Sequence, residues 1–187
     1  PKVAGNTIHN LLKDDYDISC QVWDNHIGSN QGFWVDDIDK HAKLSEIVER
    51  FPDCRHYHKL SVIRNPWDRA ASFYSWKMLH DKTSKISFKE WFFRNIDGEL
   101  EPLVEWWKLD STIDIDTLLV FEHLEDELKQ FLPELLSRRF EEIPRINASK
   151  KPHYRSFYEN DSGFDEELIE RVRDYFKEDL ELRHYEF

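Results

Sequence analysis

A short run near the start of the sequence has the residue types of an anion-binding loop. It reads Pro1-Lys2-Val3-Ala4-Gly5-Asn6-Thr7, and apolar residues at helical spacing follow it. Gly5 lets the backbone approach a ligand closely, and the N–H groups of residues 5–8 would point outward at the positive end of a helix. Lys2 adds a positive charge and Thr7 a hydroxyl donor. A tight turn with a solvated lysine is the alternative, and the run is not a Walker A loop, because it lacks the second Gly and the Lys-Ser/Thr pair.

A second group of residues could bind a phosphate. Arg64 directly follows the apolar run Leu60-Ser61-Val62-Ile63, and Ser72 lies about two turns into the helix expected from Pro66 onward. A guanidinium binds phosphate through two parallel hydrogen bonds, and the Ser72 hydroxyl would be close enough to donate to the same phosphate. The alternative is a plain surface salt bridge between Arg64 and Asp68.

The elements that must position these residues alternate along the chain. Short β-like runs and amphipathic stretches follow one another, which predicts an α/β fold with a mainly parallel sheet. In such sheets ligands bind beyond the carboxyl ends of the strands, where Arg64 would lie. Strands are predicted at 18–23, 59–63 and 117–121, helices at 6–13, 40–50, 124–137 and 165–180 as well as after Pro66 and Ser87, and a long loop at 141–163.

The order of these motifs resembles that of a known family. Lys2-Val3-Ala4-Gly5-Asn6-Thr7 is similar to the 5′-phosphosulfate loop of sulfotransferases that use 3′-phosphoadenosine 5′-phosphosulfate (PAPS). Arg64-Asn65-Pro66-Trp67-Asp68-Arg69 with Ser72 is similar to their 3′-phosphate motif. The resemblance is closest to the carbohydrate sulfotransferase branch and its bacterial relatives. It continues at Val120-Phe121-Glu122-His123-Leu124, at Asn147-Ala148-Ser149-Lys150 and at Tyr175…Asp179-Leu180-Glu181…Tyr185.

The resemblance implies a fold and an organisation. The fold would be a P-loop-NTPase-like three-layer α/β structure, with a central, mainly parallel sheet flanked by helices, in a single sulfotransferase domain over residues 1–187. Two departures accompany it. Asn6 stands where the family usually has Thr, although its amide can still donate. The strand that precedes the loop in the family is missing, so we expect the true start of the protein to lie upstream of Pro1.

The resemblance also implies roles for individual residues. Lys2 would stabilise the bridging oxygen as negative charge builds on the 5′-phosphate of PAPS, while Arg64 and Ser72 would hold the 3′-phosphate. Either Lys150 or Lys151 would close over that phosphate. The remaining donor-binding residues form the loop that cradles the 5′-phosphate: Ala4, Gly5, Asn6, Thr7 and Ile8.

The base that activates the acceptor hydroxyl has three candidates. His41 stands at the start of a predicted helix, where several carbohydrate sulfotransferases resembling this chain place their catalytic histidine. A neutral imidazole suits deprotonation of a sugar hydroxyl near neutral pH. His26 is the second candidate and Glu122 the third, although Glu122 is favoured as a structural acceptor. A surface histidine that only caps a helix is the alternative for His41.

The amino-acid composition indicates which classes of molecule the protein can bind. The chain has 187 residues, and 38 Asp and Glu against 26 Lys and Arg leave a net charge of -12. An acidic chain of this kind argues against binding nucleic acid or anionic membrane. The acceptor is therefore predicted to be a neutral or weakly charged hydroxyl compound, a saccharide or a glycolipid head group. Only Cys20 and Cys54 occur, so a reducing, cytoplasmic location is predicted, and no apolar run is long enough to span a membrane.

Parts of the sequence are also compatible with two other functions and with two other kinds of site. A P-loop-like nucleotide kinase is disfavoured, because the chain has no Walker A loop. A degenerate sulfotransferase-like module that binds nucleotide without catalysis is the main alternative. Trp106-Trp107 could stack on a sugar, but their helical spacing favours the core. His56 and His58 have no further ligand nearby, so no metal site is predicted.

Overall fold

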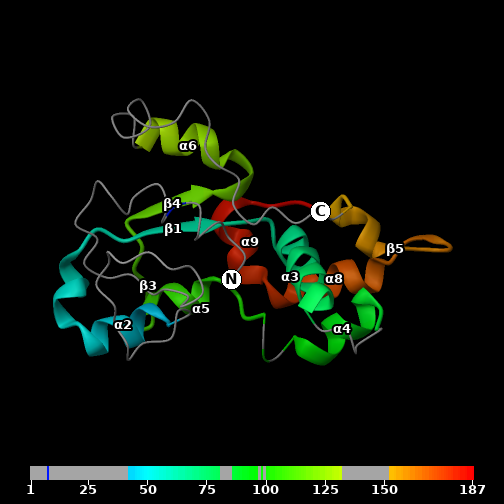
Figure 1. Cartoon of the computed structure of the whole chain (residues 1–187), viewed down its shortest axis with the longest axis horizontal. Coiled ribbons are helices and arrows are strands. Elements are labelled where there is room, and N and C mark those ends of the chain that lie inside the picture. Colours follow the sequence, from blue (N-terminus) through cyan, green and yellow to red (C-terminus); the bar gives the residue numbers. More distant parts are fainter. Residues whose placement is uncertain (1–7, 9–41, 81–85, 97, 99, 132–151) are drawn as a thin grey trace.

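The structure is a computed structural model, and it describes residue 8 and residues 42–80, 86–96, 98, 100–131 and 152–187. Its centre is a pair of parallel strands, β1 (Leu60–Ile63) and β4 (Thr117–Val120) (Figure 1). Val62 lies opposite Leu119 and Ile63 opposite Val120. The two strands that the apolar runs predicted are confirmed. The predicted strand at 18–23, and the predicted helix at 6–13 apart from Ile8, lie outside the described residues.

The other described elements are mostly short helices. Their bounds are α2 (Leu44–Arg50), η1 (Pro52–His56), α3 (Pro66–His80), α4 (Phe88–Asn95), α5 (Val104–Trp107), β2 (Lys108–Leu109), β3 (Thr112–Ile113), η2 (Phe121–His123), α6 (Leu124–Phe131), η3 (Tyr154–Tyr158), β5 (Glu159–Asn160), β6 (Gly163–Phe164), α8 (Glu166–Tyr175) and α9 (Lys177–Arg183). Two antiparallel hairpins, β2–β3 and β5–β6, accompany the parallel pair. The described part of the chain is therefore an α/β structure.

Alternating side chains of the two strands serve two different cores, as the period of a strand requires. Val62 and Leu119 pack with Leu128 of α6 and with Ile8. On the other face, Ile63 packs with residues of α5, and Leu118, Val120 and α9 residue Leu182 complete that cluster. Helices therefore cover both faces of the β1–β4 pair. This arrangement places the ends of β1 and β4 between packed layers.

A further, aromatic core joins α3, α4, α8 and η3 (Figure 1). Trp67 of α3 is fully buried, and its indole N–H donates to the carbonyl of Ile169 in α8 (3.1 Å). Tyr158 donates its hydroxyl to the carbonyl of Trp67 (3.0 Å). Ser87 begins α4 as predicted, because its hydroxyl accepts from the N–H of Glu90 (3.2 Å). Trp107 is also buried, in the α5 cluster, which supports the core interpretation of this tryptophan.

Two predictions about the carboxyl-terminal third are wrong. The helix predicted at 165–180 is two helices, because Phe176 (φ −101°, ψ 25°) leaves helical geometry between α8 and α9 and is fully buried. The loop predicted at 141–163 is structured in its described part, where η3 packs on α3 and β5–β6 form a hairpin whose second strand begins at Gly163 (φ 119°).

Smaller differences occur at other ends of elements. The helix predicted at 40–50 begins at Leu44, and the strand predicted at 117–121 ends at Val120, because Phe121 already belongs to η2. The helix predicted at 124–137 is described only as far as Phe131.

A buried ion pair connects three of the helices. Arg69 of α3 is 2% exposed and lies 3.4 Å from the carboxylate of Asp179 in α9, which is 0% exposed. Asp179 also accepts from the backbone N–H groups of Leu103 (2.8 Å) and Val104 (2.9 Å) at the start of α5. Burial lowers the pKa of Arg69 to about 10, against the effect of Asp179. The guanidinium is therefore still charged at neutral pH, and α3, α5 and α9 meet at one charge pair.

The substitution Asp179→Asn should destabilise the fold strongly. It would remove the carboxylate charge that faces the buried Arg69 guanidinium, and the single amide oxygen could not accept from both N–H groups in the same way. Breaking a buried pair by removing one partner costs about 3–5 kcal/mol. We expect a loss of this size in the free energy of unfolding measured by urea denaturation.

The neighbouring residue Glu178 provides the control. It lies on the same helix, is exposed, and pairs with Lys108 at 3.1 Å. An exposed pair contributes at most about 1 kcal/mol, so Glu178→Gln should change stability little. Equal effects of the two substitutions would contradict a central role for the Arg69–Asp179 pair.

Candidate functional site at the carboxyl edge of the sheet

Arg64 and Phe121 meet at the edge of the sheet where β1 and β4 end. Because the two strands are parallel neighbours, the residues that follow them lie at the same edge. The guanidinium of Arg64 lies over the ring of Phe121, 4.2 Å from its centroid. A cation over an aromatic face is held there by the charge distribution of the ring. The ring thus supports the guanidinium from one side.

Asp68 holds the same guanidinium through two of its nitrogens. Nε (2.8 Å) and Nη2 (2.7 Å) of Arg64 both donate to Oδ2 of Asp68. The alternative predicted from the sequence, a pair between these residues, is therefore present, but it is not a surface pair. The two side chains are only 9% and 17% exposed. Asp68 and Phe121 fix the orientation of a largely buried guanidinium.

The turn between β1 and α3 is fixed by Asn65. Its side-chain oxygen accepts from the backbone N–H groups of Trp67 (3.0 Å) and Asp68 (3.2 Å), which caps the helix. Pro66 occupies the first helical position, where its missing N–H leaves no bond unmade. The Asn-Pro pair therefore ends the strand and starts the helix, as the sequence predicted.

Ser72 lies further along α3 and is 2% exposed. A serine hydroxyl can donate one hydrogen bond, so this side chain is chemically suited to a ligand that brings an acceptor. Arg64 and Ser72 are the two members of the predicted phosphate site that the structure describes in full.

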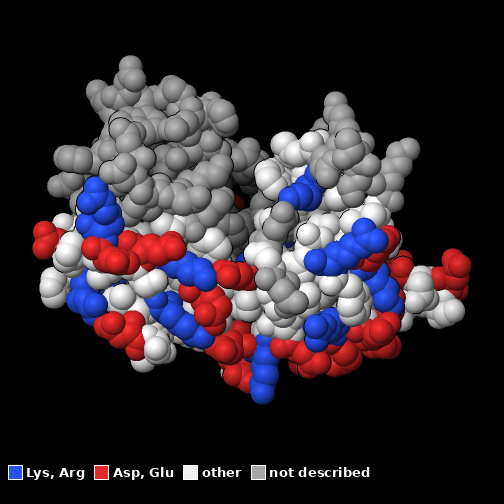
Figure 2. Space-filling view, turned by 90° about the horizontal axis from the view of Figure 1, so that it is seen from below, with Lys and Arg blue, Asp and Glu red and all other residues white. Residues whose placement is uncertain are grey.

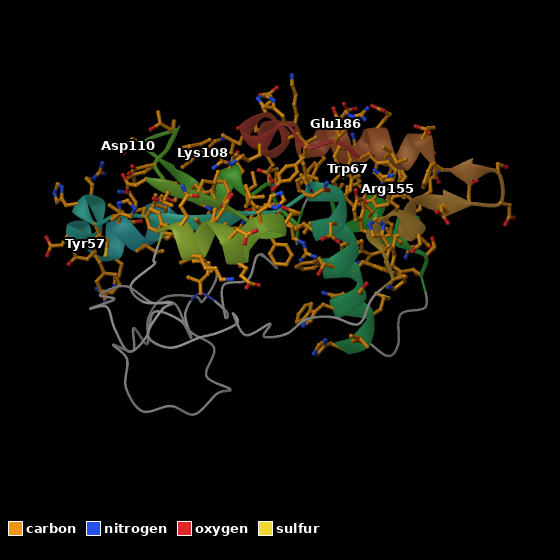
Figure 3. The ribbon with its side chains drawn as sticks, turned by 90° about the horizontal axis from the view of Figure 1, so that it is seen from above. Tyr57, Trp67, Lys108, Asp110, Arg155 and Glu186 are labelled. Atoms are coloured by element: carbon orange, nitrogen blue, oxygen red, sulfur yellow. The ribbon has the colours of Figure 1, made fainter. Side chains whose placement is uncertain are left out.

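Glu122 joins this edge to the carboxyl-terminal segment. Its Oε1 accepts from the backbone N–H of Asn65 (2.8 Å), and its Oε2 accepts from the hydroxyl of Tyr185 (3.0 Å). Asn65 also donates its side-chain N–H to the carbonyl of Glu186 (3.2 Å). Figure 3 shows Glu186, Trp67 and Arg155 near one another, on the side of the molecule away from Tyr57 and Asp110. The structural interpretation of Glu122 agrees with these contacts.

The other predicted site residues fall into two groups. Ile8 is described, and its partly buried side chain packs on the Val62 and Leu119 face of the sheet. The rest lie outside the described residues: Lys2, Ala4, Gly5, Asn6, Thr7, His26, His41, Lys150 and Lys151. Their roles stay predictions.

Charges of both signs are mixed over the face shown in Figure 2. Several described lysines on the molecule have acidic partners: Lys43 pairs with Glu101, Lys59 with Asp114 and Asp116, and Lys89 with Asp165 and Glu167.

Within the described residues no group of three or more His, Cys, Asp or Glu side chains could hold a metal ion. His58 instead contacts the Thr117 hydroxyl at 2.9 Å. Over the same residues, no helix combines the length and apolar character of a membrane span.

A comparison with models of known protein families identifies the family to which the chain belongs. The model of a family described as the sulfotransferase family matches residues 1–186. The chain is a member of the sulfotransferase family. Membership supports sulfuryl transfer as its general chemistry. No curated protein and no solved structure matches the chain.

Sequence reasoning missed two contributors to the site of this sulfotransferase. The sequence pattern places Phe121 in a strand, whereas it begins η2 and its ring lies against the Arg64 guanidinium. Tyr185 contacts Glu122 across 63 residues of sequence, a separation that no local pattern indicates. The i to i+4 spacing of Arg64 and Asp68 is the local feature of the sequence that indicates a contact between these two side chains.

Proposed function

We propose that the protein is a PAPS-dependent sulfotransferase that acts on a saccharide or glycolipid hydroxyl. The observation that carries the proposal is the buried Arg64 guanidinium at the carboxyl edge of the sheet, with Ser72 on the helix that follows. A charged donor and a hydroxyl donor of this kind suit a phosphate monoester. The helices on both faces of β1–β4 support a P-loop-like three-layer arrangement of the whole chain. A family match over residues 1–186 does not favour a binding module without catalysis.

In the proposed reaction the acceptor oxygen bonds to sulfur as the bond from sulfur to the 5′-phosphate oxygen breaks. The products are a sulfate ester and adenosine 3′,5′-bisphosphate. Arg64 and Ser72 bind the 3′-phosphate and so hold the nucleotide in place. Lys2 and the N–H groups of residues 5–8 stabilise the charge that develops on the 5′-phosphate. His41 takes the acceptor proton, with His26 as the second candidate.

The charge of the protein supports a neutral or weakly charged acceptor. A sulfated polymer binds along a trough of Lys and Arg that displaces its counter-ions, whereas the face in Figure 2 mixes both signs. The net charge of -12 points the same way. Aromatic contacts and hydrogen bonds would then hold a neutral sugar.

The first prediction concerns the nucleotide. The preference for adenosine 3′,5′-bisphosphate over AMP should exceed about tenfold, because a charge-assisted hydrogen bond contributes about 1.5–3 kcal/mol. Adenosine 2′,5′-bisphosphate has the same phosphates with one at a different ribose position, and it should bind like AMP. Thermal shift and calorimetry measure both comparisons.

Substitution of Arg64 tests whether this residue causes the preference for the 3′-phosphate. Arg64→Ala should abolish the preference for the 3′,5′-bisphosphate and raise the KM for PAPS about 10- to 100-fold. Arg55→Ala is the matched control, since Arg55 is exposed and pairs with Asp110 before β1. A preference that survives in Arg64→Ala would place the 3′-phosphate elsewhere.

The second prediction concerns the base. His41→Ala should lower kcat about 10²- to 10⁴-fold while the KM for PAPS stays unchanged, because a general base acts in the transition state and does not bind the donor. Steady-state kinetics with saturating acceptor measures this, and His56→Ala is the control. Full turnover in His41→Ala would transfer the role to His26.

The third prediction concerns the acceptor. Its KM should change little between low salt and about 0.15 M salt, because screening at that ionic strength weakens exposed charge contacts and a neutral sugar makes few of them. Initial rates over a salt series give the answer. A KM that rises steeply with salt, or retention on immobilised heparin, would indicate a polyanionic acceptor.

A further inference from the structure

The carboxylate of Glu122 joins three segments that are far apart in the sequence. It follows β4, it accepts from the N–H of Asn65 just after β1, and it accepts from Tyr185 just after α9. Both of its oxygens are therefore engaged by protein donors. Each oxygen keeps a second lone pair, so these two bonds fix the orientation of the carboxylate, and the variants below test whether it also acts as a base.

Asn65 carries the effect of this carboxylate to Arg64, its direct neighbour in the chain. The Asn65 backbone N–H is held by Glu122, its side-chain oxygen caps α3, and its side-chain N–H is held by the Glu186 carbonyl. Three separate segments thus fix the residue that follows Arg64. The guanidinium projects from a backbone with little freedom to rotate.

Tyr185 is suited to be a permanent donor in this arrangement. Its ring packs in both the aromatic core and the α5 cluster, so the position of the hydroxyl is set by packing. Burial and the neighbouring Glu122 carboxylate raise the pKa of Tyr185 well above its usual value. The phenol therefore stays protonated at any physiological pH.

We propose that Glu122 and Tyr185 form a positioning pair, which holds the β1–α3 turn so that Arg64 meets the donor 3′-phosphate, and that Glu122 is not the general base. The proposal rests on the proposed function, since it assigns Arg64 to the donor. It adds to that function a route by which the carboxyl-terminal segment sets the affinity for the donor. The link runs from α9 through Tyr185 and Glu122 to Asn65.

Three variants of the full chain separate the roles. Tyr185→Phe removes one hydroxyl and keeps the packed ring. Glu122→Gln keeps an oxygen that can accept from Asn65 but cannot act as a carboxylate base, whereas Glu122→Ala removes both functions. Tyr57→Phe is the control, because Tyr57 is 43% exposed and lies at the opposite end of the molecule (Figure 3).

The expected result is a split between donor binding and turnover. Tyr185→Phe and Glu122→Ala should weaken binding of adenosine 3′,5′-bisphosphate and raise the KM for PAPS about 2- to 10-fold, the value of one intramolecular hydrogen bond. AMP binding should be unchanged, and kcat should change far less than KM. Glu122→Gln should restore most of the affinity lost in Glu122→Ala.

Amide hydrogen exchange at Asn65, followed by NMR, tests the pair without any nucleotide. Exchange should accelerate in Glu122→Ala and in Tyr185→Phe but not in Tyr57→Phe. Unchanged exchange in both variants, or a fall in kcat of about 10²-fold or more in Glu122→Gln as for a lost base, would overturn the proposal. If the wild type binds adenosine 3′,5′-bisphosphate no better than AMP, the proposed function itself is overturned.

Discussion

The structure depends on one buried charge pair, Arg69 with Asp179. A guanidinium with almost no exposed surface requires a counter-ion within reach, because an unpaired charge in the interior costs several kcal/mol. The counter-ion comes from α9, and the same carboxylate binds the first N–H groups of α5. The orientation of α9 against α3 is therefore decided by electrostatics as well as by apolar packing. The break at Phe176 fits this requirement, since it lets α9 begin in a new direction with Phe176 buried near Arg69.

The position of α9 then determines what happens at the carboxyl edge of the sheet. Tyr185 follows this helix directly after His184, which has a left-handed backbone (φ 50°, ψ 45°). Through Tyr185 the helix contacts Glu122, and through Glu122 it contacts the turn that carries Arg64. The buried pair is thus linked to the residue proposed to bind the donor through α9, the Tyr185–Glu122 and Glu122–Asn65 hydrogen bonds, and the peptide bond from Asn65 to Arg64. Asp68 and Phe121 complete the support of Arg64 from its other sides.

Sequence reasoning predicted the elements that follow local rules. The apolar runs at β1 and β4, the Asn-Pro start of α3 and the Ser87 cap of α4 are determined by neighbouring residues, and the structure confirms them. The break at Phe176 and the β5–β6 hairpin could not be predicted, because burial of one ring and packing of η3 on α3 are tertiary effects. The partner of Arg69 lies 110 residues away in the sequence, which no local pattern indicates. The roles assigned to the amino-terminal loop, the cytoplasmic location and the single-domain organisation stay predictions.

The most direct test of the account is a crystal structure of the protein with adenosine 3′,5′-bisphosphate. The account predicts the 3′-phosphate at the carboxyl edge of β1, with its oxygens about 2.7–2.9 Å from the Arg64 guanidinium and within hydrogen-bond reach of the Ser72 hydroxyl. Glu122 should still accept from the Asn65 N–H and from Tyr185 in that complex. A nucleotide bound elsewhere, or one whose 3′-phosphate touches neither Arg64 nor Ser72, would contradict it.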